Sequence, residues 1–379
     1  MYNKLISKYE LECDQFYQEI TSLEEQQEVL EYGLEGLIKI SESIENTLKY
    51  NGVNVKSAQF IHLAVNGYIG RLGMSSIELI PSIESFNENY NQSITRISLE
   101  NIKEKALRLW NKIKTIVSNI WESIKNFFSR WSKWIKEMLR VSNKQKNKIE
   151  KIKKGVRPKE EGLKVTIPSQ LQYRGKLDLV SIIHGLNDNE KVSITMNERY
   201  LKEVKELITH VVEFVEDRKP DNLHPVFDSS INSATLIRII NNVLDRDLLG
   251  GKTLINDNIT VKLIDIKNKL EEDKTIKVPT INQIDELRTT VHRLLNTNSN
   301  LEEGLNSFEK VKNLSINRID NWFKRNVVSW ATTKATKTLQ RNFLKPVIDL
   351  ARLNYMVSKA TLRLIDDCLE CYDLDDESD

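Results

Sequence analysis

The cysteine and histidine residues are the first candidates for chemistry in this sequence. Cys368 and Cys371 form a CxxC pair, the spacing used by zinc sites and redox-active dithiols. No second pair and no nearby histidine supply the further ligands that zinc needs. None of the histidines lies at metal-ligand spacing from another or from a cysteine: His62, His184, His210, His224 and His292. We expect no metal and no other cofactor, with one cysteine facing a helical core and the other incidental.

The glycine-rich and acidic segments do not predict catalysis either. Leu248–Thr253 reads LLGGKT but lacks the spaced first glycine of a phosphate-binding loop, so we expect a turn that leads into a strand. The hydrolase patterns GxSxG and HExxH are absent. The adjacent carboxylates of Asp366 and Asp367 lie in an acidic C-terminal segment, where solvation explains them. The sequence therefore predicts a protein that is not an enzyme.

The segment PSIESF contains residues that could be a substrate for proteolysis. Ser82, Ile83, Glu84 and Ser85 follow Pro81, which ends any helix before it and favours an extended backbone. Other Ser-x-Glu tripeptides, such as Ser98–Glu100, mostly lie in predicted helices, where a protease cannot take an extended strand. An exposed loop at Ser82–Glu84 is the better site for cleavage.

The net charge of +2 hides three regions of different sign. Residues 1–84 hold 6 Lys and Arg against 13 Asp and Glu, residues 85–160 hold 19 against 7, and residues 161–379 hold 31 against 34. A basic middle region can bind polyanions, and an acidic head can shield it.

The apolar spacing predicts helices on both sides of PSIESF. Residues 9–49 and 56–71 repeat apolar positions at helical spacing. From Ile94 one amphipathic stripe continues for about 45 residues, with Trp110, Trp121, Trp131 and Trp134 on or beside it, and we expect it to fray into a basic linker beyond Val141. The opposite face carries the predicted nucleic-acid-binding residues: Lys112, Lys114, Lys125, Arg130, Lys133, Lys136, Arg140, Lys144, Lys146, Lys148, Lys151, Lys153 and Lys154.

Beyond residue 160 the period changes to short β-branched runs. LKVTIPSQL, KVSITM, GGKTLINDNITVKLIDI and KTIKVPTI are predicted strands, with helices at about 197–217 and 232–247. Helices follow from Ile281, from Leu301 to about 328, and from 335 to about 369, the last bent at Pro346.

These elements predict a mainly α protein with a small α+β unit. We expect an acidic helical propeptide at 1–84, a basic Trp- and Lys-rich amphipathic helix and linker at 85–160, a small mixed α/β unit at 161–280, and a C-terminal helical bundle with an acidic tail at 281–379. The N-terminus lacks the apolar core of a signal peptide and no apolar run is long enough to span a membrane, so we expect synthesis in the cytoplasm.

PSIESF followed by ISLENIKEKALRLWNKI and IWESIKNFF resembles the internal head proteins of large contractile-tailed bacteriophages. The resemblance covers roughly residues 25–140, with Ile83 where Leu is common and Asn101 where Gly is common. It implies packaging in the prohead core with scaffold or core proteins, and cleavage by the prohead protease after Glu84. It also implies that the mature part stays in the capsid interior with the packaged DNA, and it leaves open whether that part is ejected with the DNA.

Two other functions are compatible with the sequence. The Lys and Trp composition of the basic helix also suits an anionic membrane, as in an injected membrane-active phage protein. A helical adaptor outside the virion is the second alternative, since an amphipathic stripe usually packs on other helices of its own chain.

Overall fold

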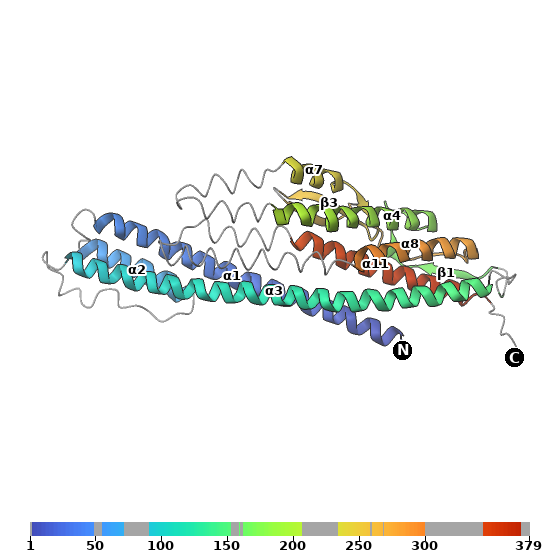
Figure 1. Cartoon of the computed structure of the whole chain (residues 1–379), viewed down its shortest axis with the longest axis horizontal. Coiled ribbons are helices and arrows are strands. Elements are labelled where there is room, and N and C mark those ends of the chain that lie inside the picture. Colours follow the sequence, from blue (N-terminus) through green and yellow to red (C-terminus); the bar gives the residue numbers. More distant parts are fainter. Residues whose placement is uncertain are drawn as a thin grey trace. The chain divides into compact units, whose positions relative to one another are not determined.

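The computed structural model (Figure 1) describes residues 2–48, 55–71, 91–152, 159, 162–206, 234–257, 260–267, 269–299 and 344–372. These residues fall into two compact units, which meet in sequence between Phe127 and Phe128. Each unit is described by itself.

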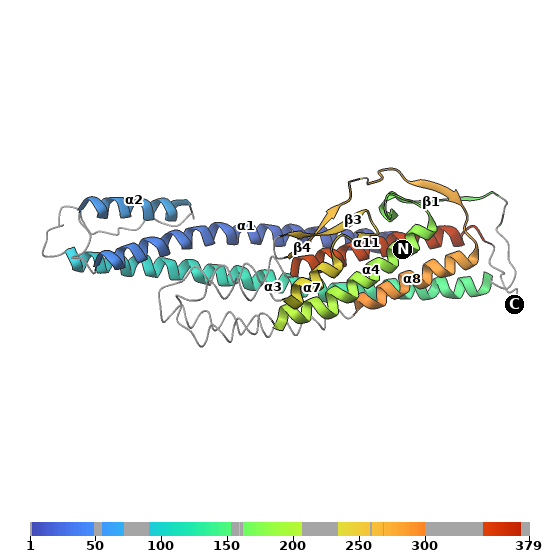
Figure 2. The same cartoon turned by 90° about the horizontal axis from the view of Figure 1, so that it is seen from above.

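The first unit contains three helices that share one core. Helices α1 (Tyr2–Leu48) and α2 (Val55–Arg71) contact one another (Figure 2), and the first part of α3 (Asn91–Ile152) completes the group. Gly36 of α1 is required for close packing, because a Cβ there would lie 2.6 Å from the ring of Tyr68. The core is the side-chain cluster of Leu34, Leu37, Ile38, Ile44, Val65, Ile69, Leu99, Ile102, Ala106, Leu109, Trp110, Ile113 and Val117.

Helix α1 meets α3 along much of its length. The rings of Phe16 and Phe127 stack with their centroids 4.3 Å apart. Ser123 Oγ donates a hydrogen bond to Glu19 Oε1 over 2.8 Å, and Lys103 forms an ion pair with Glu45. Low residue numbers in α1 therefore meet high numbers in α3, so the two helices run antiparallel.

Helix α3 is longer than the sequence pattern predicts. It has 62 residues and continues to Ile152, so the prediction of fraying beyond Val141 is wrong. Ser142, Gln145, Ile149 and Ile152 are buried, and Gln145 Nε2 donates to the carbonyl of Leu362 over 2.8 Å. Beyond Val141 the stripe has fewer apolar residues because a serine and a glutamine occupy some of its buried positions. The buried positions still follow the helical spacing.

The second unit packs its helices around α11 (Lys345–Leu369). Helix α11 contacts α4 (Leu179–Ile194) and α8 (Ile281–Ser299). It also contacts the strands β1 (Lys164–Ile167) and β4 (Thr260–Asp265) and the 3₁₀ turn at Ser169–Leu171. Its buried residues lie all round the helix, which is typical of a central core helix. A π-helix at Thr195–Tyr200 extends α4, and α7 spans Ala234–Val243.

Two small antiparallel sheets complete this unit. Strand β1 (Lys164–Ile167) pairs with β5 (Lys274–Lys277), with Val165 opposite Ile276. The other sheet has the order β2 (Asp247–Leu248), β3 (Lys252–Asp257) and β4 (Thr260–Asp265). Gly250 and Gly251 join β2 to β3 at φ values of +99° and +66°, which glycine adopts without a Cβ penalty. The predicted turn into a strand at LLGGKT is confirmed.

The predicted strand KVSITM is helical instead. It lies across the end of α4 and the start of the π-helix. Asp178 caps the helix by accepting a 2.8 Å hydrogen bond from Ser181 N, and Ile182, Leu186 and Val192 are buried. Six residues were too few to distinguish a half-buried strand from part of a longer helical pattern.

The other predictions for this region agree with the structure where it is described. LKVTIPSQL, GGKTLINDNITVKLIDI and KTIKVPTI all contain strands, and helices occupy 234–243 and 281–299. Pro346 lies in the first turn of α11, while the predicted helix at 301–328 and the segment before Leu344 lie outside the described residues. The predicted fold class, mainly α with a small α+β unit, is confirmed.

A buried polar network connects the central helices of the second unit. Asn354 of α11 accepts a 3.0 Å hydrogen bond from Asn189 of α4 and donates to Ser193 Oγ over 2.7 Å. Asn189 Oδ1 also accepts from Leu249 N over 2.9 Å. Asn298 of α8 lies 3.4 Å from the Asn354 amide, and its carbonyl accepts a hydrogen bond from the Trp131 indole over 3.3 Å. The network fixes how α4, α8 and α11 are rotated against one another.

We expect Asn354→Ala to destabilise the second unit. The amide of Asn189 and the hydroxyl of Ser193 would lose a buried partner, at a cost of about 1–3 kcal/mol for each unpaired group. Met356→Ala on the same helix is the control, because Met356 is 42% exposed and its replacement should cost within about 0.5 kcal/mol. Urea unfolding followed by tryptophan fluorescence measures both, and equal unfolding midpoints for the two variants would contradict a structural role for the network.

Candidate nucleic-acid interface

The outward face of α3 in the second unit is a ridge of positive charge. Arg130, Lys133, Arg140, Lys144, Lys148 and Lys151 follow one another at intervals of three, four or seven residues, so they lie on one side of the helix. All six are exposed, as is Lys136 beside them, and Lys146 is exposed on another side of the helix. At 1.5 Å per residue the ridge is about 30 Å long, close to one turn of duplex DNA.

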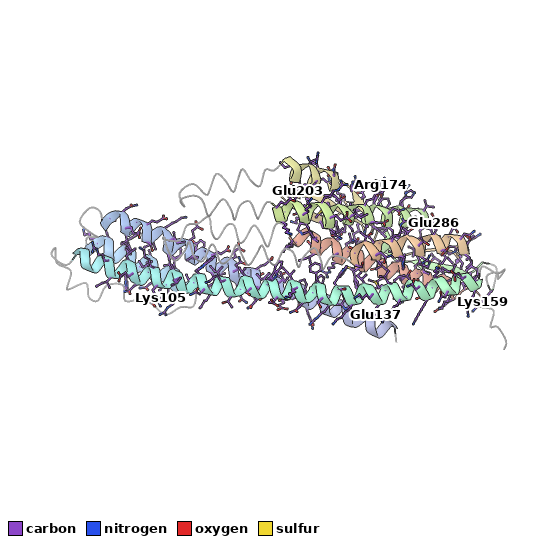
Figure 3. The ribbon with its side chains drawn as sticks, in the orientation of Figure 1. Lys105, Glu137, Lys159, Arg174, Glu203 and Glu286 are labelled. Carbon is purple, nitrogen blue, oxygen red and sulfur yellow. The ribbon has the colours of Figure 1, made fainter. Side chains whose placement is uncertain are left out.

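Two ion pairs between described residues lie along this stretch of α3. Arg140 forms an ion pair with Glu137, which is labelled in Figure 3, and Lys146 lies 3.7 Å from Glu150. All four side chains are largely exposed, so these pairs are weak and exchange readily with solvent or a phosphate. The ammonium and guanidinium groups of the exposed ridge are therefore accessible to a phosphate group.

The first unit carries the remaining predicted basic residues. Lys112 and Lys125 are exposed on α3, and Lys114 is half-buried. Nearer the start of the helix, Lys103 pairs with Glu45 and Arg108 with Glu104. Lys153 and Lys154 lie outside the described residues, as do the predicted cleavage residues Ser82, Ile83, Glu84 and Ser85.

The aromatic stripe of α3 lies on the buried side of the helix. Trp110, Trp121, Trp131 and Trp134 are each at most 3% exposed. In the second unit Trp131, Trp134 and Tyr355 form a cluster with ring centroids 5.7 to 6.4 Å apart. These tryptophans hold α3 in its units, and the helix presents lysine and arginine, not indole rings, to the solvent.

A histidine lies directly behind the basic ridge. His292 of α8 lies with Nδ1 3.1 Å from the hydroxyl of Ser142, which is fully buried on α3. Partial burial of His292, with Arg288 and Lys146 nearby, lowers the pKa of its imidazole. The neutral form of His292 is therefore the one that suits the folded state.

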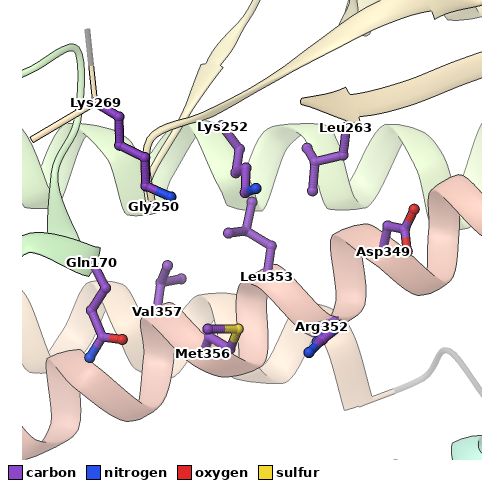
Figure 4. A pocket seen from close by; sticks show the side chains of 10 residues that line it. All are labelled: Gln170, Gly250, Lys252, Leu263, Lys269, Asp349, Arg352, Leu353, Met356 and Val357. Atoms are coloured by element: carbon purple, nitrogen blue, oxygen red, sulfur yellow. The ribbon is translucent and has the colours of Figure 1, made fainter. Parts of the chain in front are cut away.

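A pocket of about 450 Å³ opens between the β3–β4 hairpin and α11 (Figure 4). Lys252, Lys269 and Arg352 line it together with Asp349 and several apolar side chains. Asp265 accepts from both Lys252 and Lys269, at 2.9 and 2.8 Å, and this contact lowers the pKa of its carboxyl. Because a carboxylate already engages both ammonium groups, the pocket is not a preformed phosphate site, and the sequence did not predict it.

The other candidates for chemistry are described by their burial and their neighbours. Cys368 is buried and burial raises the pKa of its thiol to about 12, while Cys371 is partly exposed at the end of α11. Within the described residues, no group of three His, Cys, Asp or Glu side chains is placed to hold a metal ion. No described helix is both long and apolar enough to cross a bilayer. His210 and His224 lie outside the described residues.

A mainly helical fold with an exposed basic ridge defines the architecture of the chain but not its function. The comparison with protein families is more specific. The family model of the phiKZ-like phage internal head proteins matches residues 4–351, and the chain belongs to this family. Its place is therefore the interior of the phage head. Neither the curated proteins nor the solved structures contain a significant match.

We expect His292 to make the second unit less stable in mild acid. Below the ordinary histidine pKa of 6.5 the imidazole takes up a proton more readily in the unfolded chain than in the folded chain. The free energy of unfolding therefore decreases as the pH is lowered. Thermal unfolding at pH 7 and pH 5.5 should show a smaller loss for His292→Gln than for the native chain. His184→Gln, at an exposed position on α4, is the control and should behave like the native chain. An equal loss in all three proteins would contradict this role of His292.

Proposed function

We propose that this internal head protein is packaged in the prohead core and that its mature part binds the packaged DNA through the basic ridge of α3. The ridge is the observation that supports the proposal. Six cations on one side of a continuous helix match the demand of a phosphate backbone, which is clustered positive charge without base-specific contacts. The proposed partners are the scaffold or core proteins, the prohead protease and the DNA.

The burial of the tryptophans favours DNA over an anionic membrane as the partner of this helix. A membrane-bound amphipathic helix inserts its aromatic residues into the interface between lipid and water. In this protein Trp121, Trp131 and Trp134 are inside the folded units. Binding to a membrane would require unfolding, whereas phosphate groups reach the lysine and arginine side chains directly. Family membership likewise favours a virion component over an adaptor outside the virion.

The proposal includes removal of the acidic N-terminal segment by cleavage after Glu84. That segment carries 13 Asp and Glu against 6 Lys and Arg, so its loss raises the net charge from +2 to +9. Helix α1 lies against α3, with Glu19 and Glu45 in contact with Ser123 and Lys103. At least one carboxylate of the segment therefore pairs directly with a lysine of α3, in the first unit. Cleavage would increase the affinity for DNA, and the mature part would be free to leave the head with it.

We expect charge reversal on the ridge to reduce the salt dependence of DNA binding. The variant Lys133→Glu, Lys144→Glu, Lys148→Glu, Lys151→Glu loses four phosphate contacts on the ridge, which should lower the logarithmic salt slope by about 3.6. Fluorescence anisotropy with duplexes of unrelated sequence, from 50 to 300 mM salt, measures the slope and its independence of sequence.

A control for this experiment makes the same change of net charge elsewhere. Lys262, Lys267, Lys274 and Lys277 are exposed on the strands and connections of the small sheets, and their reversal to Glu should leave most of the slope intact. If both quadruple variants lose the same slope, the effect reports net charge alone and the ridge is not the binding surface.

We expect processing to depend on the side chain of Glu84. Replacement by Gln removes the charge that a glutamate-specific protease pocket requires, so Glu84→Gln should remain uncut in assembled particles. Sequencing the N-terminus of the protein from purified virions should find Ser85 in the native phage. Glu78→Gln is the matched control and should be processed normally. An intact N-terminal segment in finished native virions would refute the cleavage.

A further inference from the structure

Helix α2 carries apolar side chains on two opposite faces. Val65 and Ile69 on its inner face are fully buried in the three-helix core. On the outer face Phe60 and Leu63 are 76% and 71% exposed, the two largest exposures among the large apolar residues that the structure describes. A helix at the surface of a soluble unit normally places charged residues on its outer face.

The charges of α2 do not follow that rule. Lys56 and Arg71 are its only charged residues, and they stand at its two ends. Helix α3, by contrast, presents a ridge of lysine and arginine to the solvent. An uncharged outer face with two large exposed side chains is typical of a surface that a partner covers.

The order of residues on this face specifies the partner. Gly67 and Gly70 share the outer face with Phe60 and Leu63, and a Cβ added at either glycine would meet only open space. The four residues are placed symmetrically about Val65 in the sequence. Phe60 lies as far before Val65 as Gly70 lies after it, and Leu63 lies as far before Val65 as Gly67 lies after it. When two such helices run antiparallel about a two-fold axis at Val65, Phe60 of one copy therefore lies level with Gly70 of the other, and Leu63 with Gly67.

We propose that the outer face of α2 binds the same face of a second copy of this chain, antiparallel and with the two-fold axis at Val65. In this arrangement each large side chain occupies the space that a missing Cβ leaves in the partner helix. Residues that contact one another reciprocally in this way define an isologous interface, the usual form in homodimers. A parallel pair would instead place the large residues level with each other and leave the glycines facing an empty groove.

Charges of both signs stand where the ends of the two α2 helices meet in this arrangement. The ring of Tyr32 on α1 lies 5.8 Å from that of Tyr68, so the residues of α1 before Tyr32 lie beside the C-terminal end of α2. Exposed Glu25 and Glu28 are among them. Lys56 of the second copy arrives at this end, where the carboxylates and the negative end of the helix dipole attract it and Arg71 repels it.

The size of the interface indicates a weak dimer. The interface consists of one face of a 17-residue helix from each copy. An interface of this size buries less than about 1,200 Å² in total, which is the range of transient complexes. Such a contact forms when many copies are concentrated together and separates on dilution. The residues of this interface precede Glu84, so they belong to the segment that cleavage would remove. The dimer of the uncut chain does not depend on that cleavage.

Sedimentation velocity of the uncut full-length chain tests the proposal. We expect a monomer at low micromolar concentration and a dimer as the concentration rises, with dimerisation weakened at least tenfold by Phe60→Glu, Leu63→Glu. Both side chains are exposed, so the circular dichroism and unfolding midpoint of the variant should match the native chain. Val180→Glu, Ile237→Glu is the control, since these residues are 62% and 42% exposed in the other unit.

Disulfide cross-linking tests the direction of the helices. In a chain with Cys13→Ser and Cys371→Ser, a mixture of Leu63→Cys and Gly67→Cys proteins should cross-link more readily than either protein alone, because only the mixture places two cysteines at the same level. A chain that stays monomeric, a dimer that the double glutamate variant leaves intact, or stronger cross-linking within each single variant would each overturn the proposal. None of these outcomes bears on cleavage after Glu84 or on DNA binding.

Discussion

Burial of the apolar stripe of α3 is the constraint on which both units depend. In the first unit residues from Leu99 to Val117 complete the core that α1 and α2 begin, and in the second unit Trp131 and Trp134 pack against Tyr355 of α11. Each large apolar side chain contributes about 1.5–3 kcal/mol by leaving water. When this stripe is buried, the helical period places the intervening lysines and arginines on the opposite, solvent-exposed side of the helix. The exposure of the basic ridge is therefore a consequence of the packing behind it and requires no separate stabilising contact.

Apolar burial alone would not fix the arrangement of the second unit. Helix α11 is buried on nearly all sides, so rotating it about its axis would replace one apolar contact with another of similar energy. Asn189, Ser193, Asn298 and Asn354 remove that freedom, since their amides and hydroxyl find partners in one rotation only. A fully satisfied polar network in a core of low dielectric constant specifies one packing, because every alternative leaves a polar group unpaired.

The sequence predicted the long helices and most strands because their periods extend over many residues. The stripe from Ile94 is visible without a structure, and so is the basic face opposite it. The pattern failed where polar residues fill buried positions, as Ser142 and Gln145 do at the end of α3. It failed again at KVSITM, where six residues match the period of a strand while belonging to a helix. The polar network, the pocket beside α11 and the two-faced character of α2 depend on which distant residues meet, and no local period records that.

Because α1 and α2 pack on α3, cleavage after Glu84 would not by itself release the N-terminal segment. The protease would cut the covalent link, but Leu34, Leu37 and Val65 would still be packed against Ile102 and Trp110. The propeptide would remain as a separate chain in a non-covalent complex, and it could leave only when the three-helix core opens. Departure would then be a matter of kinetic stability, governed by an unfolding rate that rises steeply with temperature. The lifetime of this small core, and not the rate of proteolysis, would determine how long the cleaved acidic segment stays bound to the mature chain.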